Sequence, residues 1–225
     1  VSEEINFDGT VDEAFWNQVP ILPLKMHWPS YAGELTEETE IRFFYDDEFI
    51  YIGAICYDSE PDLMQEVSFE RDAISEQSEG VTITIDPYND KENALVFFVT
   101  LTGSRTDMTI QNDAQGSGVF STSWNSYWDA KVSKKENGWH TEIKIPFSSL
   151  RFQVVDDKVK MGIGIYRFIP RKREMQIYPD IPPDWGYWSF VKPSKLQVTE
   201  FEGIKNKRPW YTTPYVLGGV GYHNE

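Results

Sequence analysis

Several tryptophans stand in stretches that read as loops, where an aromatic side chain can meet a ligand instead of filling a core. Trp28, Trp185 and Trp188 each lie close to a proline, and Trp210 lies in a similar stretch near the end of the chain. An indole ring combines a flat apolar face with a polar edge, so it can stack on the apolar face of a sugar. We predict Trp185, Trp188 and Trp28 as ligand-binding residues. The competing interpretation is that these rings pack against the edge of the fold.

Clustered oxygen-bearing side chains raise the question of a metal ion. Asp86, Asn89 and Asp90 fall within one short turn, and hard cations such as Ca²⁺ prefer several oxygen ligands that converge from a loop. The spacing does not follow that of an EF-hand, and Asp and Asn side chains also form turns by bonding to the nearby backbone. Calcium at Asp86, Asn89 and Asp90 is therefore one prediction, and turn formation without a metal is the alternative. No other cofactor is expected.

The sequence lacks the residue patterns that support catalysis. Its three histidines, His27, His140 and His223, form no His-x-x-x-His pair, and neither a Gly-x-Ser-x-Gly elbow nor a phosphate-binding loop occurs. The 36 acidic residues are numerous enough to include a catalytic pair of carboxylates of the glycosidase type, but no pattern in the sequence points to such a pair. The single cysteine, Cys56, excludes an internal disulfide and a Cys-based zinc site. We expect no enzymatic activity.

The charge of the chain excludes two classes of partner. The formal net charge is −15, from 36 acidic and 21 basic residues. Such a chain is a poor binder of the phosphate backbone of nucleic acids, and it is also a poor binder of anionic lipid surfaces. An acidic surface suits a domain outside the cytoplasm, although charge by itself does not fix the compartment.

Apolar and polar residues alternate with a period of two along much of the chain. Residues 81–86 and 139–145 show the alternation that is typical of strands with one buried side. Many short strands, separated by turn residues such as Asn137-Gly138, indicate an antiparallel β-sandwich. Four tryptophans in strand or motif positions are predicted core residues: Trp16, Trp124, Trp128 and Trp139. The predicted strands are 40–45, 49–57, 81–86, 94–102, 105–111, 128–133, 139–145, 160–168 and 195–201.

Helix is scarce, so the predicted fold class is all-β with a short N-terminal helix. Thr10 and Glu13 have the spacing of a capping box, and residues 14–16 would follow as that helix. The sandwich is expected to span residues 1–207 as one domain. Residues 208–225 are aromatic, rich in glycine and low in charge, which predicts an extended tail. An edge strand or a disordered tail is the alternative.

A series of motifs follows in order along the chain. Residues 7–13 with Trp16 open the series, Tyr45-Asp46-Asp47 lies at a predicted hairpin, and Ile145-Pro146-Phe147 follows a predicted strand. Their order and spacing resemble those of family 9 carbohydrate-binding modules, which have a DOMON-like β-sandwich fold. The resemblance covers nearly the whole chain, and it implies recognition of a ligand without catalysis.

A second set of motifs has a narrower resemblance. Asp86–Asp90, Leu150–Phe152 and the closing Pro214-Tyr215 are similar to segments of bacterial proteins of unknown function that place such a module before an outer-membrane β-barrel. This implies a location in the cell envelope, either in the periplasm or at the cell surface, with residues 208–225 leading into the barrel. The implied partners are that barrel and either a carbohydrate or an envelope protein. Further matches to this group are Arg71-Asp72, Gly103 with Asp107, Arg167, Arg171 and Arg173-Glu174.

Family 9 modules that bind sugar hold a terminal ring between two tryptophans, with charged side chains at the hydroxyl groups. By this resemblance the first tryptophan would come from residues 73–80, which contain no aromatic residue, and the charged positions would fall near Thr82 and Phe98. Trp185 and Trp188 are the candidates for the second ring. The leading prediction is therefore a non-catalytic recognition or scaffold domain of the envelope. The alternative is a genuine carbohydrate-binding module that captures polysaccharide for glycan breakdown.

A weaker alternative is a haem electron-transfer domain, because some relatives of this sandwich bind haem b through Met and His. Met26 and His27 are adjacent, and successive side chains of an extended chain point in opposite directions. Two axial ligands must converge on one iron, so this pair has the wrong geometry for such a site.

Overall fold

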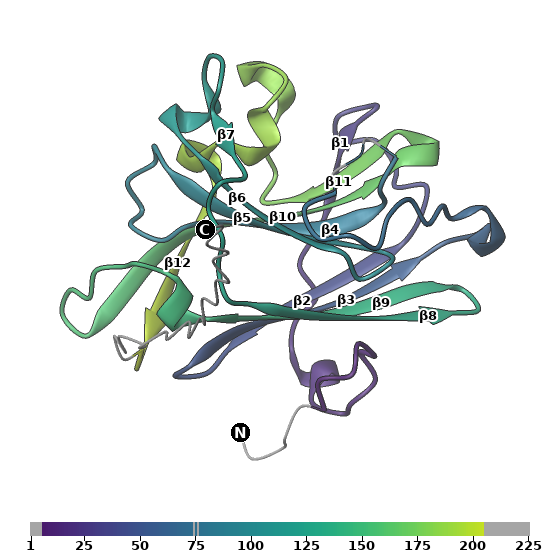
Figure 1. Ribbon diagram of the computed structural model, residues 1–225, viewed down its shortest axis with the longest axis horizontal. Helices are drawn as coiled ribbons and strands as arrows, with labels where there is room; N and C mark the ends of the chain where they lie inside the picture. The colour runs from purple at the N-terminus through teal and green to yellow at the C-terminus, as the bar shows by residue number, and fades with distance from the viewer. Residues whose placement is uncertain (1–5, 74, 76, 205–225) are drawn as a thin grey trace, which may run out of the picture.

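The computed structural model describes residues 6–73, 75 and 77–204, which form two antiparallel sheets packed face to face (Figure 1). The larger sheet has the order β1-β11-β10-β4-β5-β6-β7, and the smaller one has the order β2-β3-β9-β8. The long strand β10 pairs with β11 near its end and with β12 near its start, and with β4 on its other side. The predicted all-β antiparallel sandwich is confirmed. The strands are β1 (Lys25–Trp28), β2 (Thr39–Tyr45), β3 (Phe49–Tyr57), β4 (Gly80–Asp86), β5 (Ala94–Thr100), β6 (Arg105–Ile110), β7 (Phe120–Ser121), β8 (Asp129–Lys135), β9 (Gly138–Pro146), β10 (Lys158–Ile169), β11 (Glu174–Tyr178) and β12 (Gln197–Glu202).

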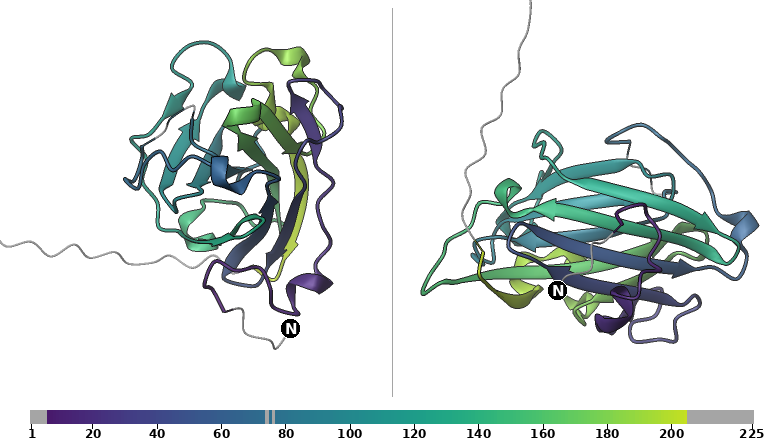
Figure 2. Two further views of the ribbon diagram at one scale, coloured as in Figure 1. Left: turned by 90° about the vertical axis from the view of Figure 1, so that its right-hand side faces the viewer. Right: turned by 90° about the horizontal axis from the view of Figure 1, so that it is seen from below.

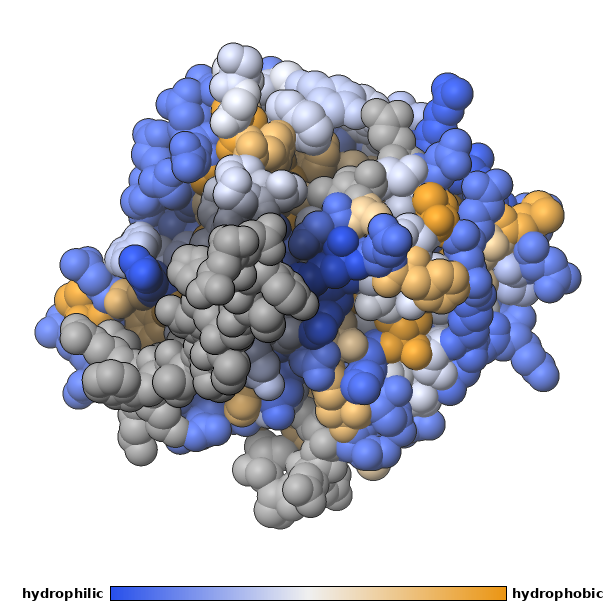
Figure 3. Space-filling view, in the orientation of Figure 1, coloured by the Kyte–Doolittle hydropathy of each residue, from blue (hydrophilic) through white to orange (hydrophobic). Residues whose placement is uncertain are grey.

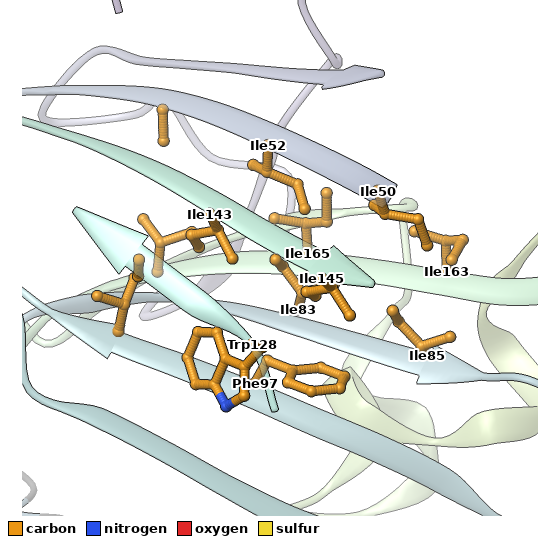
Figure 4. Packing of buried hydrophobic residues seen from close by; sticks show 14 of the residues in the cluster. Ile50, Ile52, Ile83, Ile85, Phe97, Trp128, Ile143, Ile145, Ile163 and Ile165 are labelled. Carbon is orange, nitrogen blue, oxygen red and sulfur yellow. The ribbon is translucent and has the colours of Figure 1, made fainter. Parts of the chain in front are cut away.

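The core lies between the two sheets and is built largely from isoleucine (Figure 4). Alternate residues of each central strand face this layer, as the period of two predicts. Burying an aliphatic side chain of this size stabilises the fold by about 1.5–3 kcal/mol. Cys56 also lies in this core as a buried free thiol. The facing isoleucines are Ile50, Ile52, Ile143 and Ile145 from the smaller sheet, and Ile83, Ile85, Ile163 and Ile165 from the larger sheet.

The tryptophans predicted as core residues pack where the alternation places them. Trp16, Trp128 and Trp139 are buried, and Trp124 is partly buried and packs against the central cluster. Trp16 contributes to a separate cluster on the outer face of the smaller sheet, under the N-terminal segment that Figure 2 shows crossing that sheet in its right-hand view. The sandwich therefore has apolar packing on the outside of the smaller sheet as well as between the layers.

The helical elements of the described residues are single 3-10 turns, and the N-terminal one corrects part of the prediction. It covers Trp16–Gln18, and Thr10 does not cap it. The capping box does not form because its groups have other partners: the N–H of Thr10 donates to Asp8, and the hydroxyl of Thr10 accepts from Lys135. The side chain of Glu13 accepts the N–H of Asn6. The turns are η1 (Trp16–Gln18), η2 (Pro61–Leu63), η3 (Asn112–Ala114), η4 (Phe147–Ser149), η5 (Pro170–Lys172), η6 (Pro183–Trp185), η7 (Ser189–Val191) and η8 (Pro193–Lys195).

The hairpin between β8 and β9 depends on Gly138. Its φ is +141°, a conformation that residues with a side chain rarely adopt, and a Cβ there would lie 2.1 Å from the carbonyl oxygen of Cys56. The predicted turn at Asn137-Gly138 is confirmed by the pairing of β8 with β9 on either side of it.

Several arginines of the second motif set form ion pairs within the sandwich. Arg167 is fully buried, and its guanidinium donates to Glu79 at 2.7 Å. Glu79 also accepts the indole N–H of Trp139 at 2.9 Å. Arg171 pairs with Asp58 beside this group. Because a buried charge is costly without a partner, these arginines have a structural role at one end of the sandwich.

The surface of the domain is mixed in character. On the face shown in Figure 3, hydrophobic residues form small separate patches among hydrophilic ones. No helix within the described ranges is long and apolar enough to cross a membrane. Trp210, His223 and the predicted tail, residues 208–225, lie outside the described residues.

Candidate functional site

The three tryptophans predicted to bind a ligand all lie at the surface. Trp28 ends β1 and is 37% exposed, Trp185 ends η6 and is 45% exposed, and Trp188 precedes η7 and is 38% exposed. The segment that carries the last two residues lies over the outer face of the larger sheet, on the side away from the smaller sheet (Figure 1). Short turns with proline at their first positions hold this segment in a compact shape.

Two of the three tryptophans come together through a tyrosine. The ring centroid of Tyr187 lies 5.3 Å from that of Trp28 and 4.7 Å from that of Trp188, and both contacts are edge to face. Tyr187 is 57% exposed. We call Trp28, Tyr187 and Trp188 the aromatic surface. Edge-to-face rings make it corrugated instead of flat, so a ligand ring would stack on one side chain while its rim contacts the next.

Trp185 does not belong to the aromatic surface. The ammonium group of Lys195 lies 3.8 Å from its ring centroid, which is the geometry of a cation–π contact. Tyr187, in contrast, was missed by the sequence reasoning. Its signal was its position between Gly186 and Trp188, in the stretch already chosen for its tryptophans.

A buried histidine supports the aromatic surface from below. His27 is 1% exposed, its Nδ1 lies 2.9 Å from the carbonyl oxygen of Ile181, and its Nε2 lies 3.3 Å from the hydroxyl of Ser189. Its ring is parallel to that of Trp28, with centroids 6.4 Å apart. Burial lowers the pKa of His27, while the bond to the Ile181 carbonyl acts in the opposite direction. The neutral ring that results donates to Ile181 and accepts from Ser189, which ties β1 to the segment carrying Trp188.

Phe190 and Tyr166 connect the aromatic surface to the sheet beneath it. Phe190 packs edge to face on Tyr166 of β10, with centroids 5.2 Å apart, and it also contacts Trp188 and His27. Burial raises the pKa of Tyr166 to about 12. The exposed rings therefore rest on an apolar layer, so they keep their positions without a ligand.

One polar pair borders this region. The hydroxyl of Tyr31, in the loop after β1, donates to a carboxylate oxygen of Asp180 at 2.7 Å. That hydrogen bond, together with the negative charges of Asp180 and Asp184, raises the pKa of Tyr31. Carboxylates beside aromatic rings can accept hydrogen bonds from the hydroxyl groups of a bound molecule.

Comparison with known proteins identifies the family of this chain. The family model described as carbohydrate family 9 binding domain-like matches residues 7–171, which is most of the chain. The chain belongs to this family. No curated protein matches it.

Solved structures share the fold of this family 9-like domain. A family 9 carbohydrate-binding module from Caldicellulosiruptor kristjanssonii, in complex with cellotriose, is 17% identical with a TM-score of 0.58, covering 94% of this chain and 96% of that one. The complex of such a module from the same organism with glucose is 17% identical with a TM-score of 0.56, covering 91% and 93%. A protein from Bacteroides uniformis ATCC 8492, proposed to bind carbohydrate, is 14% identical with a TM-score of 0.65, covering 83% and 88%. At these identities the likeness concerns the fold alone.

The positions expected for the charged grips of a family 9 site carry no charge here. Thr82 and Phe98 pair across β4 and β5, and both are buried. They lie on the outer face of the larger sheet, because their neighbours Val81 and Ile83 face the central core. The aromatic surface is therefore built from the β1 and η6–η7 side of the sheet, without an opposing ring from residues 73–80.

The side chains predicted as calcium ligands are engaged in holding a turn. The two carboxylate oxygens of Asp86 accept the N–H groups of Asp90 at 3.2 Å and of Lys91 at 2.8 Å. Asp90 accepts the N–H groups of Glu92 and Asn93 with one carboxylate oxygen. Among the described residues, no group of three or more His, Cys, Asp or Glu side chains could hold a metal ion. The oxygens of Asp86 and Asp90 thus have the turn-forming role that was the alternative, and a calcium ion there stays a prediction.

The haem alternative finds no support at His27. Both ring nitrogens are within hydrogen-bonding distance of protein atoms, so neither is free to bind iron. Met26 is buried beside it in β1. The structure thus agrees with the geometric objection to this pair.

Proposed function

We propose that this domain is a non-catalytic recognition domain that binds a carbohydrate on the aromatic surface formed by Trp28, Tyr187 and Trp188. The observation that carries the proposal is the contact between these exposed rings on a buried support. Membership of the family adds to it, since modules with this fold were solved with cellotriose and glucose. Aromatic rings of this kind bind the apolar faces of sugars.

The surface is open on one side, because the described part of residues 73–80 contributes no aromatic ring. A clamp of two facing rings encloses one terminal sugar, whereas an open surface lets a chain continue in both directions. We therefore expect binding to internal units of an oligosaccharide, with an affinity that rises with chain length as more rings are contacted.

We also propose that the domain is located in the bacterial cell envelope, attached to an outer-membrane β-barrel in the full-length protein. Its support is the resemblance of Asp86–Asp90, Leu150–Phe152 and Pro214-Tyr215 to proteins with that arrangement. The test is to sequence the gene beyond the codon for Glu225. The proposal expects segments of about ten residues with alternating hydrophobicity, and a stop codon directly after Glu225 would contradict it.

The binding proposal is tested by titrating the domain with glucose, cellotriose and longer neutral oligosaccharides while tryptophan fluorescence is followed. Saturable quenching is expected, and Trp188→Ala should weaken the affinity about five- to tenfold, the loss of about 1–1.5 kcal/mol of ring contact. Trp185→Ala is the matched control, because it removes an exposed tryptophan that lies outside the aromatic surface.

Two results would contradict the binding proposal. Quenching that survives in Trp188→Ala and disappears in Trp185→Ala would move the site away from the aromatic surface. A flat response across the whole panel would exclude neutral carbohydrate as the ligand of the aromatic surface, and an envelope protein would then be the partner to seek.

A further inference from the structure

A separate hollow opens at the end of the larger sheet where β5 begins and β6 ends. Its volume is about 220 Å³, and it lies between the β4–β5 hairpin, the end of β6 and the segment after η4. Pockets for drug-sized ligands measure about 300–1,000 Å³, so this one suits a smaller molecule, such as a single sugar ring. The lining includes the aromatic and polar residues Tyr88, Asn93, Gln111, Trp124, Ser149 and Arg151.

The charge of the hollow differs from that of the chain as a whole. Arg151 is the only charged side chain among the lining residues, in a protein whose net charge is −15. It is exposed, and it forms no ion pair or hydrogen bond with another described residue. Five other arginines each contact a carboxylate: Arg42, Arg71, Arg105, Arg167 and Arg171. Arg151 thus lines the hollow with a guanidinium group that has no carboxylate partner among the described residues.

The turn that carries Tyr88 and the ring of Trp124 are held in place before any ligand arrives. Tyr88 is 51% exposed on the turn that Asp86 fixes by accepting the N–H groups of Asp90 and Lys91. Trp124 packs edge to face on Phe97 of the core, with ring centroids 5.7 Å apart. Two motifs of the second sequence set, Asp86–Asp90 and Leu150–Phe152, therefore meet at one place, where each contributes a side chain to the lining.

We propose that this hollow binds the carboxylate-bearing ring of a uronic acid. A guanidinium binds a carboxylate through two parallel hydrogen bonds, which gives both strength and orientation. Tyr88 and Trp124 would contact the apolar face of the sugar, and the amides of Asn93 and Gln111 would meet its hydroxyl groups. The site takes an acidic sugar, and it does not depend on the proposed binding of neutral sugars by Trp188.

The test is isothermal titration of the domain with sodium glucuronate, sodium galacturonate, glucose and sodium acetate at constant ionic strength. At least one uronate should bind saturably, and glucose and acetate at least tenfold more weakly, because each lacks one half of the recognised group. Arg151→Gln should weaken uronate binding at least tenfold, and Tyr88→Ala several-fold. Lys25→Gln, which removes a positive charge from an exposed residue at the opposite edge of the sheet, should leave the affinity unchanged.

Three outcomes would overturn the proposal. Two concern the wild type: no saturable binding of uronate, or equal affinity for acetate and uronate. The third is equal uronate binding by Arg151→Gln, provided that the unfolding temperature of this variant matches that of the wild type. Trp188→Ala distinguishes this site from the aromatic surface, since it should weaken the binding of neutral oligosaccharides about five- to tenfold and leave uronate binding intact. Loss of uronate binding in Trp188→Ala, with binding retained in Arg151→Gln, would place the acidic sugar on the aromatic surface instead.

Discussion

Glu142 should make the stability of this domain depend on pH between about 4.5 and 7. Its side chain is 1% exposed on β9, and it accepts the N–H groups of Asp8 and Gly9, each at 2.9 Å. It also accepts the indole N–H of Trp16 at 3.3 Å. Burial, together with the charge of Glu13, raises the pKa of Glu142 from its ordinary value of 4.5 to about 7, although the three N–H groups act in the opposite direction.

The sign of the effect follows from proton binding. Between pH 4.5 and 7 the native state holds a proton on Glu142 that the unfolded chain has already lost, so the free energy of unfolding falls as the pH rises. At about 1.4 kcal/mol per pH unit, a pKa change from 4.5 to about 7 amounts to about 3 kcal/mol. This contribution is fully present below pH 4.5 and is lost above pH 7.

The assay is urea unfolding of the wild type and of Glu142→Gln at several pH values from 4.5 to 8, followed by tryptophan fluorescence. Glutamine is uncharged throughout, so the stability of the wild type relative to Glu142→Gln should fall by about 2–3 kcal/mol over this range. Glu136→Gln makes the same change at an exposed residue of the β8–β9 turn, and it should give a difference that is small and independent of pH. A relative stability that stays constant or grows with pH would refute the reasoning, because the N–H groups would then keep the carboxylate ionised in the native state at every pH.

Three further predictions concern the framework. Arg167→Met should lower the free energy of unfolding, measured with urea, by about 3–5 kcal/mol, because it leaves Glu79 buried without its ion-pair partner. The double variant that also carries Glu79→Leu should recover part of that loss. Gly138→Ala should lower the free energy of unfolding by more than about 2 kcal/mol, because φ is positive there and the new Cβ would clash with the carbonyl oxygen of Cys56. Gly116→Ala is the control and should cost less, because Gly116 also has a positive φ but has open space around it. Burial raises the pKa of the Cys56 thiol to about 12, so a thiol reagent at pH 8 should react with the unfolded chain and not with the folded domain. Fast reaction of the folded domain would show that the core opens under native conditions.

The period of two made the strands and the core predictable, because the residues of one strand carry that signal locally. Trp139 alternates with polar neighbours, and it is buried as this pattern requires. The turn at Gly138 could be predicted equally well from the sequence, since its conformation depends on the glycine itself. The capping box at Thr10 and Glu13 failed for the opposite reason. The hydroxyl of Thr10 instead accepts a hydrogen bond from Lys135, which lies far away in the sequence and is brought to Thr10 only by the folded sheet.

The candidate sites were predictable only in part, because they depend on how loops meet. Proline-rich context correctly identified Trp28, Trp185 and Trp188 as surface residues. It could not tell that Trp185 would pack with Lys195, while Tyr187 took the place between the other two rings. The meeting of Tyr88 and Arg151 at one hollow is likewise set by strand pairing, which no local pattern of either segment encodes.

The aromatic surface and the hollow share one structural feature. In each, a buried polar side chain fixes the backbone of a loop, and that loop presents an exposed ring. His27 ties β1 to the segment carrying Trp188 through Ile181 and Ser189, and Asp86 closes the turn that carries Tyr88. Binding to a ring held in this way costs little conformational entropy, so weak sugar contacts can produce measurable affinity. His27 and Asp86 therefore support binding without touching the ligand, and because both are buried, exposure alone could not identify them.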